Sequence, residues 1–133
     1  MEKKIKKVTP YEKEVMETLW ENGKPLTARE IVKYCENKKW KPSYINIMTK
    51  SLLDKELIRE VGFKRSGKNF ARIYEPTMTE EEWIVYQLMV QVKDRNQLLR
   101  EVLRAILKDT YEIEKLDEIQ DLIEARKREI IST

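Results

Sequence analysis

Apolar residues recur at helical spacing near the start of the chain, directly after a helix-start signal. Thr9-Pro10-Tyr11-Glu12 has the sequence of a capping box, in which the Thr and Glu side chains satisfy backbone N–H groups of the first turn. Asn22-Gly23 has the residue types that end helices. Between these signals, one helical face carries Tyr11, Val15, Met16, Leu19 and Trp20. The pattern predicts a first helix with this face in the core.

Two more helices are predicted in the next segment. A second capping box, Thr27-Ala28-Arg29-Glu30, precedes a short inward stripe that ends in Cys35. Because Cys packs well and no base is near in sequence, we interpret Cys35 as a small buried hydrophobe. Pro42, in Trp40-Lys41-Pro42-Ser43, suits the first turn of a third helix. The predicted buried residues are Ala28, Ile31, Val32 and Cys35 in the second helix and Ile45, Met48, Leu52 and Leu53 in the third.

A change to β-branched and aromatic residues follows the third helix. The runs 58–63 and 70–75 predict two strands of a hairpin. The polar, basic segment 64–69 between them predicts a flexible hairpin tip, and Pro76 is expected to end the second strand. Leu57 and Ile58 are expected to return to the core. Three short helices followed by a basic hairpin are typical of a winged helix-turn-helix, with the third helix as recognition helix and the hairpin as wing.

The remainder of the chain has long amphipathic helical patterns. A third capping box, Thr79-Glu80-Glu81-Glu82, opens it, and Arg95-Asn96 falls where apolar residues are expected, which predicts a break or kink. The apolar positions are Val85, Leu88, Met89, Val92, Leu99, Val102, Leu103, Ile106, Leu116, Ile119, Leu122, Ile123 and Ile130. Seams of this kind need a partner, and we expect a homodimer. An intramolecular hairpin that covers the N-terminal core remains the alternative.

Composition supports a small helical protein with two differently charged parts. Charged residues make up 38% of the 133 residues, and there are only 3 Gly and 4 Pro. Residues 1–77 contain 18 Lys and Arg and 11 Asp and Glu, a net charge of +7, whereas residues 78–133 contain 9 and 13, a net charge of −4. The expected organisation is a winged-helix DNA-binding domain over 1–77 and a helical dimerisation region over 78–133, a mainly α fold with a small β-hairpin wing.

Several function classes are excluded by missing residues. The chain has no His, which removes His-based catalytic triads and the usual His-containing zinc sites, and its three Gly are isolated from one another. We therefore expect no enzyme, no cofactor and no metal. No long apolar run or signal peptide is present, and the single Cys fits a reducing cytoplasm.

Candidate DNA contacts lie on the predicted exposed side of the third helix and on the wing. Asn46 has the chemistry for adenine, Ile47 for a thymine methyl group, and Lys50 for guanine or phosphate. Lys3, Lys4, Lys6 and Lys7 form either a basic arm or a solubilising tail. The full set of predicted DNA-binding residues is Lys41, Ser43, Tyr44, Asn46, Ile47, Lys50, Lys64, Arg65, Lys68 and Arg72. The alternative is a protein-interaction adaptor that uses Ile47 and Tyr44 as an apolar contact patch.

Several of these segments together resemble the BlaI/MecI/CopY family of penicillinase-type repressors. They are Thr9-Pro10-Tyr11-Glu12-Lys13-Glu14-Val15-Met16 with Leu19-Trp20, Leu26-Thr27-Ala28-Arg29-Glu30-Ile31, Trp40-Lys41-Pro42-Ser43-Tyr44-Ile45, Lys55-Glu56-Leu57-Ile58 and Arg72-Ile73-Tyr74-Glu75-Pro76. The resemblance implies a homodimeric winged-helix repressor that binds a palindromic double-stranded operator. It also implies, for the β-lactam members, a membrane sensor protease as a partner.

The chain departs from that family pattern at four places. Ser51 replaces the usual Arg of the third helix, and Glu56 replaces the usual Gly after Lys55. The paired Cys motifs of the copper branch are not in the sequence. The Asn-Phe dipeptide of the family's cut site occurs only at Asn69-Phe70, in the wing. The sequence therefore supports neither copper sensing nor the usual cleavage, and it leaves the operator and the inducing signal open.

Overall fold

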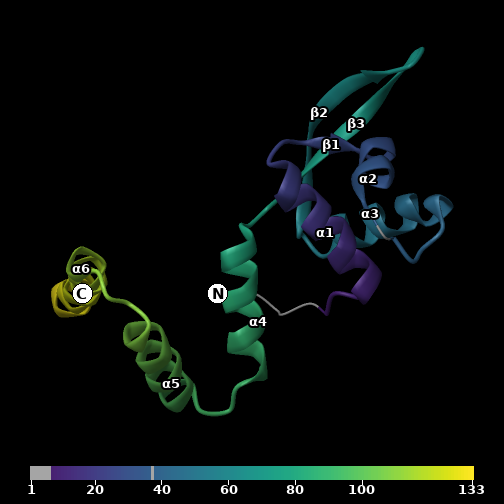
Figure 1. The fold of residues 1–133 in the computed structure, drawn as a ribbon. Helices are drawn as coiled ribbons and strands as arrows, with labels where there is room; N and C mark the ends of the chain where they lie inside the picture. The colour runs from purple at the N-terminus through teal and green to yellow at the C-terminus, as the bar shows by residue number, and fades with distance from the viewer. Residues whose placement is uncertain (1–6, 37) are drawn as a thin grey trace. The chain divides into compact units, whose positions relative to one another are not determined.

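The chain forms helices and one small antiparallel sheet, as the hydrophobic pattern predicts (Figure 1). The computed structural model describes residues 7–36 and 38–133. The elements are α1 (Pro10–Asn22), β1 (Leu26–Thr27), α2 (Ala28–Tyr34), the 3-10 turn η1 (Pro42–Tyr44), α3 (Ile45–Asp54), β2 (Ile58–Ser66), β3 (Asn69–Pro76), α4 (Glu80–Gln91), α5 (Arg95–Lys108) and α6 (Ile113–Ser132). They group into two compact units, Met1–Val90 and Gln91–Thr133.

The first two capping boxes are formed as predicted. The Glu12 backbone N–H donates to the Thr9 hydroxyl at 3.2 Å, and the Thr9 N–H donates to Glu12 Oε1 at 2.9 Å. Thr27 and Glu30 make the same pair of bonds at the start of α2, at 3.1 and 3.0 Å. Gly23 ends α1 in the left-handed conformation, with φ of 63°. These local signals set where α1 and α2 begin and where α1 ends.

The core of the first unit lies between the three helices and the inner side of the sheet. Most of the predicted inward positions are buried in it, including Cys35, and Leu57 and Ile58 return to it as expected. Tyr11 is an exception, since it is 46% exposed. Glu12 is buried in its place because it lies three, four and seven residues before Val15, Met16 and Leu19, in the middle of the inward face.

The hairpin differs from the prediction in its length and turn. Both strands extend further than expected, so that Ser66 pairs with Asn69 and only Gly67 and Lys68 form the turn. Lys64 and Arg65 therefore lie in β2 rather than in a flexible tip. A third strand, β1, was not predicted; it pairs with β3 and gives the sheet order β1-β3-β2. Three helices and this hairpin make residues 10–76 a winged helix-turn-helix.

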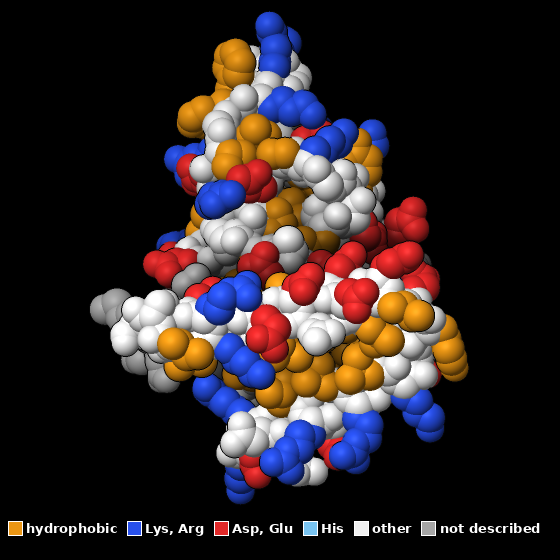
Figure 2. All heavy atoms as spheres, turned by 90° about the vertical axis from the view of Figure 1, so that its left-hand side faces the viewer, with side chains coloured by type: hydrophobic (Ala, Val, Ile, Leu, Met, Phe, Trp, Pro, Cys, Tyr) orange, Lys and Arg blue, Asp and Glu red, His pale blue; other side chains and the backbone are white. Residues whose placement is uncertain are grey.

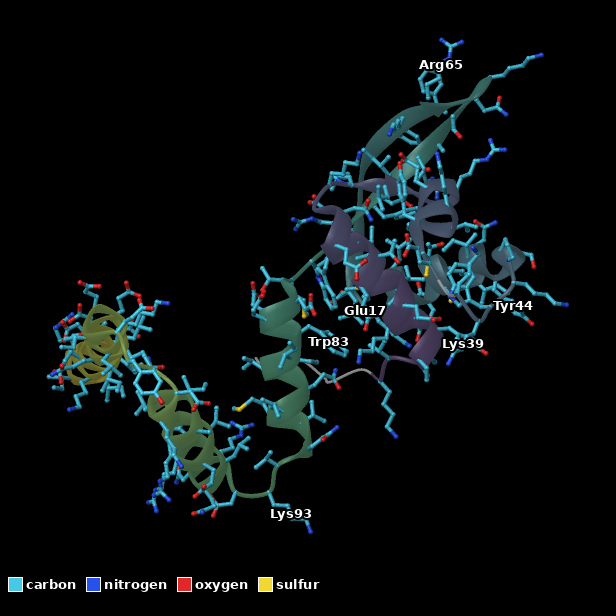
Figure 3. All side chains as sticks on the ribbon, in the orientation of Figure 1. Glu17, Lys39, Tyr44, Arg65, Trp83 and Lys93 are labelled. Carbon is cyan, nitrogen blue, oxygen red and sulfur yellow. The ribbon has the colours of Figure 1, made fainter. Side chains whose placement is uncertain are left out.

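The helix that follows the wing packs on the winged-helix core through two tryptophans. Trp20 Nε1 donates to the carbonyl oxygen of Met78 at 3.0 Å, and the ring centroids of Trp20 and Trp83 are 5.7 Å apart. Trp83 projects from α4 toward α1 (Figure 3), where the Lys13 ammonium lies 5.6 Å from its ring centroid. All of α4 except its last residue, Gln91, thus belongs to the same unit as the winged helix.

The second unit consists of α5 and α6. A break is present, but it lies at residues 92–94, just before the predicted Arg95 and Asn96, which form the first turn of α5. Asp94 caps α5 by accepting the N–H of Gln97 at 3.1 Å. None of the described helices combines the length and the apolar character that crossing a lipid bilayer requires.

Candidate nucleic-acid interface

The third helix presents a mixed polar and apolar face to solvent. Its inner side is held in the core by Ile45, Met48 and Leu52, and by Thr49, whose burial was not predicted. Its outer side is exposed, with 64% of Ile47 accessible, and Asn46 and Lys50 are exposed as well. The other predicted contacts precede α3: Ser43 and Tyr44 lie in the 3-10 turn η1 and Lys41 just before it, and all three are exposed. The outward Ile47 offers an apolar group that can contact a methyl group of a ligand.

The end of the third helix is fixed by an ion pair and a strained residue. Lys55 Nζ lies 2.7 Å from Glu12 Oε1, which ties the end of α3 to the start of α1. Burial raises the pKa of Glu12, but the hydrogen bonds from Lys55, Ser51 and Thr9 outweigh it and hold the pKa below its ordinary value. Glu56 then adopts a left-handed conformation, with φ of 60°. Its carbonyl oxygen accepts a hydrogen bond of 2.7 Å from the Thr77 hydroxyl.

The four predicted basic residues of the wing fall into two classes. Lys64 Nζ lies 2.9 Å from Glu30 Oε2, and Arg72 lies 3.2 Å from Glu60 Oε1. The hydrogen bond between Lys64 and Glu30 lowers the pKa of Glu30 and raises that of Lys64. Arg65 and Lys68 lie near the turn and form no ion pair with any residue that the structure describes (Figure 3 labels Arg65). The charge available to a polyanion is thus concentrated at the wing tip.

Two groups of exposed residues beside these positions were not predicted. Arg29, in the first turn of α2, lines a cleft with Lys64 and Arg65 and carries an exposed side chain. The helical period after the capping box was a sufficient signal for it, because Arg29 lies between the inward positions Ala28 and Ile31 and points outward. Phe63 and Phe70 are 68% and 72% exposed on the wing. Strand alternation was the signal that places them on one face with Arg65.

Three lysines of the predicted basic arm, Lys3, Lys4 and Lys6, lie outside the described residues. Lys7 is described and exposed. Within the described part of the chain, no cluster of three or more Cys, Asp or Glu side chains is arranged to hold a metal ion. The exposed residues of α3 and the wing offer hydrogen-bonding groups, positive charges and apolar side chains.

The predicted dimerisation residues are exposed or half-buried in the single chain. Leu99 and Ile106 of α5 are 57% and 51% exposed, and Val85 of α4 is 58% exposed. The others are half-buried or exposed to a lesser degree: Leu88, Met89, Val92, Val102, Leu103, Leu116, Ile119 and Ile123. Large apolar side chains in this number on solvated helices are what a protein-protein contact covers.

Two solved structures resemble this arrangement at low sequence identity. One is the adhesin competence repressor AdcR from Streptococcus pyogenes, with 13% identity over 93% of this chain and 81% of that one, and a TM-score of 0.40. The other is Bacillus subtilis PadR in complex with operator DNA, with 20% identity over 91% of this chain and 71% of that one, and a TM-score of 0.45. No individually curated protein matches the chain.

A family comparison covers nearly the whole sequence. The model of the penicillinase repressor family matches residues 8–125, which include the complete winged helix, α4, α5 and more than half of α6. This match extends well past the part of the sequence that carries the resemblance, which runs from Val8 to Glu82. The chain belongs to the penicillinase repressor family.

Proposed function

We propose that this protein represses transcription as a homodimer, in which each subunit reads one half of a palindromic operator. The observation that carries the proposal is the outer face of α3, where Asn46, Ile47 and Lys50 stand exposed together. Family membership supports the role of repressor. Repression follows when the operator overlaps a promoter, because the bound dimer then occupies the site of the polymerase.

The proposed contacts are of two kinds: base-specific contacts from α3, and sequence-independent contacts to the DNA backbone. Asn46 makes a bidentate contact to adenine, Ile47 touches a thymine methyl group, and Lys50 reaches guanine or a phosphate. Tyr44, Ser43 and Lys41 lie at the start of the helix and contact the backbone. On the wing, Arg65 and Lys68 supply unpaired charge to the DNA, and Lys64 and Arg72 contribute less while each is paired with a Glu.

Pairing of two subunits follows from the C-terminal helices. The apolar seam of α4, α5 and α6 is accessible in one chain and has the periodicity of a helical interface. Two linked winged helices bind two half-sites at once, which multiplies the affinity by effective concentration. The symmetry of the dimer then sets the symmetry of the operator.

The test is selection from a library of randomised 30-base-pair duplexes with the full-length protein. We expect enrichment of an inverted repeat whose half-sites are spaced for one dimer. Affinity for the selected duplex should fall about 10³–10⁵-fold between 50 and 200 mM salt if roughly six to ten phosphates are contacted. Absence of enrichment, together with binding that is flat with salt, contradicts the proposal and favours the adaptor alternative, in which Tyr44 and Ile47 contact a protein.

A further inference from the structure

Both phenylalanines of the chain stand exposed on the wing. Phe63 in β2 is 68% exposed and Phe70 in β3 is 72% exposed, although the core nearby is built from aliphatic side chains, Met, Trp and Tyr. Burying side chains of this size is favourable because it removes a large apolar area from water. Two such rings on a strand pair that projects into solvent therefore mark a contact surface.

The register of the hairpin places the two rings among arginines. Phe63 is directly opposite Arg72, and Arg65 is directly opposite Phe70. Residues opposite one another, and alternate residues of one strand, share a face of a sheet. Phe63, Arg65, Phe70 and Arg72 thus form one checkered patch, which we call the aromatic-arginine face. Hydrophobic and basic side chains gather at this projecting end of the molecule in Figure 2.

This face is continuous with the side of the sheet that covers the third helix. Tyr74, two residues beyond Arg72 on the same face of β3, is buried next to the Thr49 side chain of α3. Lys64 lies on the other face, opposite Ala71, and is bound to Glu30. The exposed rings therefore extend outward from the α3 side of the winged helix and not from the side anchored to α2.

The combination of arginines and apolar rings fits one kind of partner better than others. Proteins that enter the DNA minor groove use Arg for its negative potential and insert apolar wedges such as Phe between base steps, which kinks the duplex. The two phenylalanine rings could also contact a protein partner. Such a partner would not in general require two flanking arginines and the unpaired Lys68 at the turn. The charge complementarity and the continuity with the α3 face both favour DNA.

We propose that the aromatic-arginine face enters the minor groove next to the major groove read by α3. Arg65 and Arg72 lie along the groove floor, and Phe63 and Phe70 wedge against or between base steps and bend the DNA. The ion pair between Arg72 and Glu60, 3.2 Å long in the free protein, opens when that guanidinium enters the groove. The inference rests on the proposed DNA-binding function and adds a second source of specificity, the shape and deformability of the sequence under the wing.

The experiment uses a 30-base-pair duplex selected from the randomised library by the wild-type protein, with fluorophores at its two ends. Energy transfer between the ends measures the bend, and a titration measures the affinity. The variants are Phe63→Ala with Phe70→Ala, and the matched pair Phe63→Leu with Phe70→Leu, because Leu is also a competent wedge. Both rings are exposed, so the Tm of each variant should equal that of the wild type.

We expect the wild type to bend the duplex by about 20° or more. The double Ala variant should lose most of the bend and about tenfold or more in affinity, with the salt slope unchanged because no charge is lost. The double Leu variant should keep most of both. An Ala variant that binds and bends like the wild type overturns the wedge but leaves the proposed function intact. Failure of the wild type to select or bind any duplex overturns both.

Discussion

Lys64 in the wing and Glu30 in the cap of α2 are joined by an ion pair of 2.9 Å between Nζ and Oε2. Glu30 also accepts the N–H of Thr27 through its other oxygen, so one carboxylate both caps a helix and anchors β2. The positive charge of Lys64 is therefore partly neutralised by Glu30 within the protein. Lys68, two residues past the end of β2, has no such anchor among the described residues.

Lys64 and Lys68 should consequently differ in their effect on DNA binding. Lys68→Ala should reduce the slope of log affinity against log salt by about one, because one phosphate contact is lost. Lys64→Ala should reduce it clearly less, since its partner is Glu30. Titration of a scrambled duplex over a salt series measures both slopes. Equal reductions of the two slopes would show that the ion pair opens in the complex and that Lys64 contacts a phosphate as Lys68 does.

The difference between these two lysines illustrates what the sequence predicts and what it does not. Helix starts are local, so Thr9 with Glu12 and Thr27 with Glu30 were readable from four-residue windows. The ion pair of Lys64 joins residues 34 positions apart, and no local pattern indicates it. The same limit explains the unpredicted β1, whose two residues form a strand only because β3 returns beside them.

The candidate site was predictable in its helix and less so in its wing. Ile47 and Asn46 were placed outward by the 3.6-residue period alone, because Ile45, Met48 and Leu52 define the opposite face. The exposed rings of Phe63 and Phe70 were missed because β-rich aromatic runs ordinarily indicate burial. Their exposure depends on how far the hairpin projects beyond the helices, which is a property of the tertiary fold.

Glu56 should be a site where a substitution stabilises the protein. Its φ of 60° costs a residue with a Cβ about 1–2 kcal/mol, which Gly avoids. The larger entropy of Gly in the unfolded chain offsets about 0.5–1 kcal/mol of that gain. Glu56→Gly should therefore raise the free energy of unfolding by up to about 1 kcal/mol, as measured by urea denaturation. Glu56→Ala keeps the strain and is the control; a Gly variant no more stable than the Ala variant contradicts the account.

The Glu12 carboxylate should make stability depend on acid pH. Its pKa is lowered on folding, so its contribution is complete above the pKa of the unfolded chain, about 4.3, and is lost as the pH falls through the lower folded value. Glu12→Gln should cost about 1–3 kcal/mol at pH 7, since Lys55 loses its charged partner. The difference from wild type should narrow below about pH 4.

Urea denaturation at several pH values measures this difference for Glu12→Gln. The control is Glu17→Gln, because the Glu17 side chain is 45% accessible and its i,i+4 pair with Lys13 is long, at 3.8 Å. Its effect should stay within about 0.5 kcal/mol at every pH. A Glu12 difference that stays constant or widens in acid would contradict the lowered pKa of this carboxyl in the folded protein.

The C-terminal seam should hold the dimer. Leu99→Glu with Ile106→Glu places two charges in the predicted interface, so sedimentation equilibrium should show a monomer where the wild type is a dimer. Affinity for the selected duplex should fall about 10²–10⁴-fold, because two half-sites are no longer bound at once. Tyr111→Glu is the control, since Tyr111 is 87% exposed and lies between α5 and α6, outside the seam. A double variant that remains dimeric rules out the seam of α5.

Substitution of Asn46 should distinguish base-specific contacts from contacts to the DNA backbone. Its side chain is exposed on α3, and the Thr49 hydroxyl bonds to its main-chain carbonyl, a contact that an Ala side chain leaves in place. Asn46→Ala should therefore leave the fold unchanged and cost about 1–3 kcal/mol on the selected duplex, with little loss on a scrambled one. Lys68→Ala, by contrast, should weaken both duplexes to a similar extent, because a phosphate is present in every sequence. The measurement is a titration of both variants against both duplexes at two salt concentrations. Equal losses for Asn46→Ala on the two duplexes, or none on either, would mean that α3 does not read bases through Asn46.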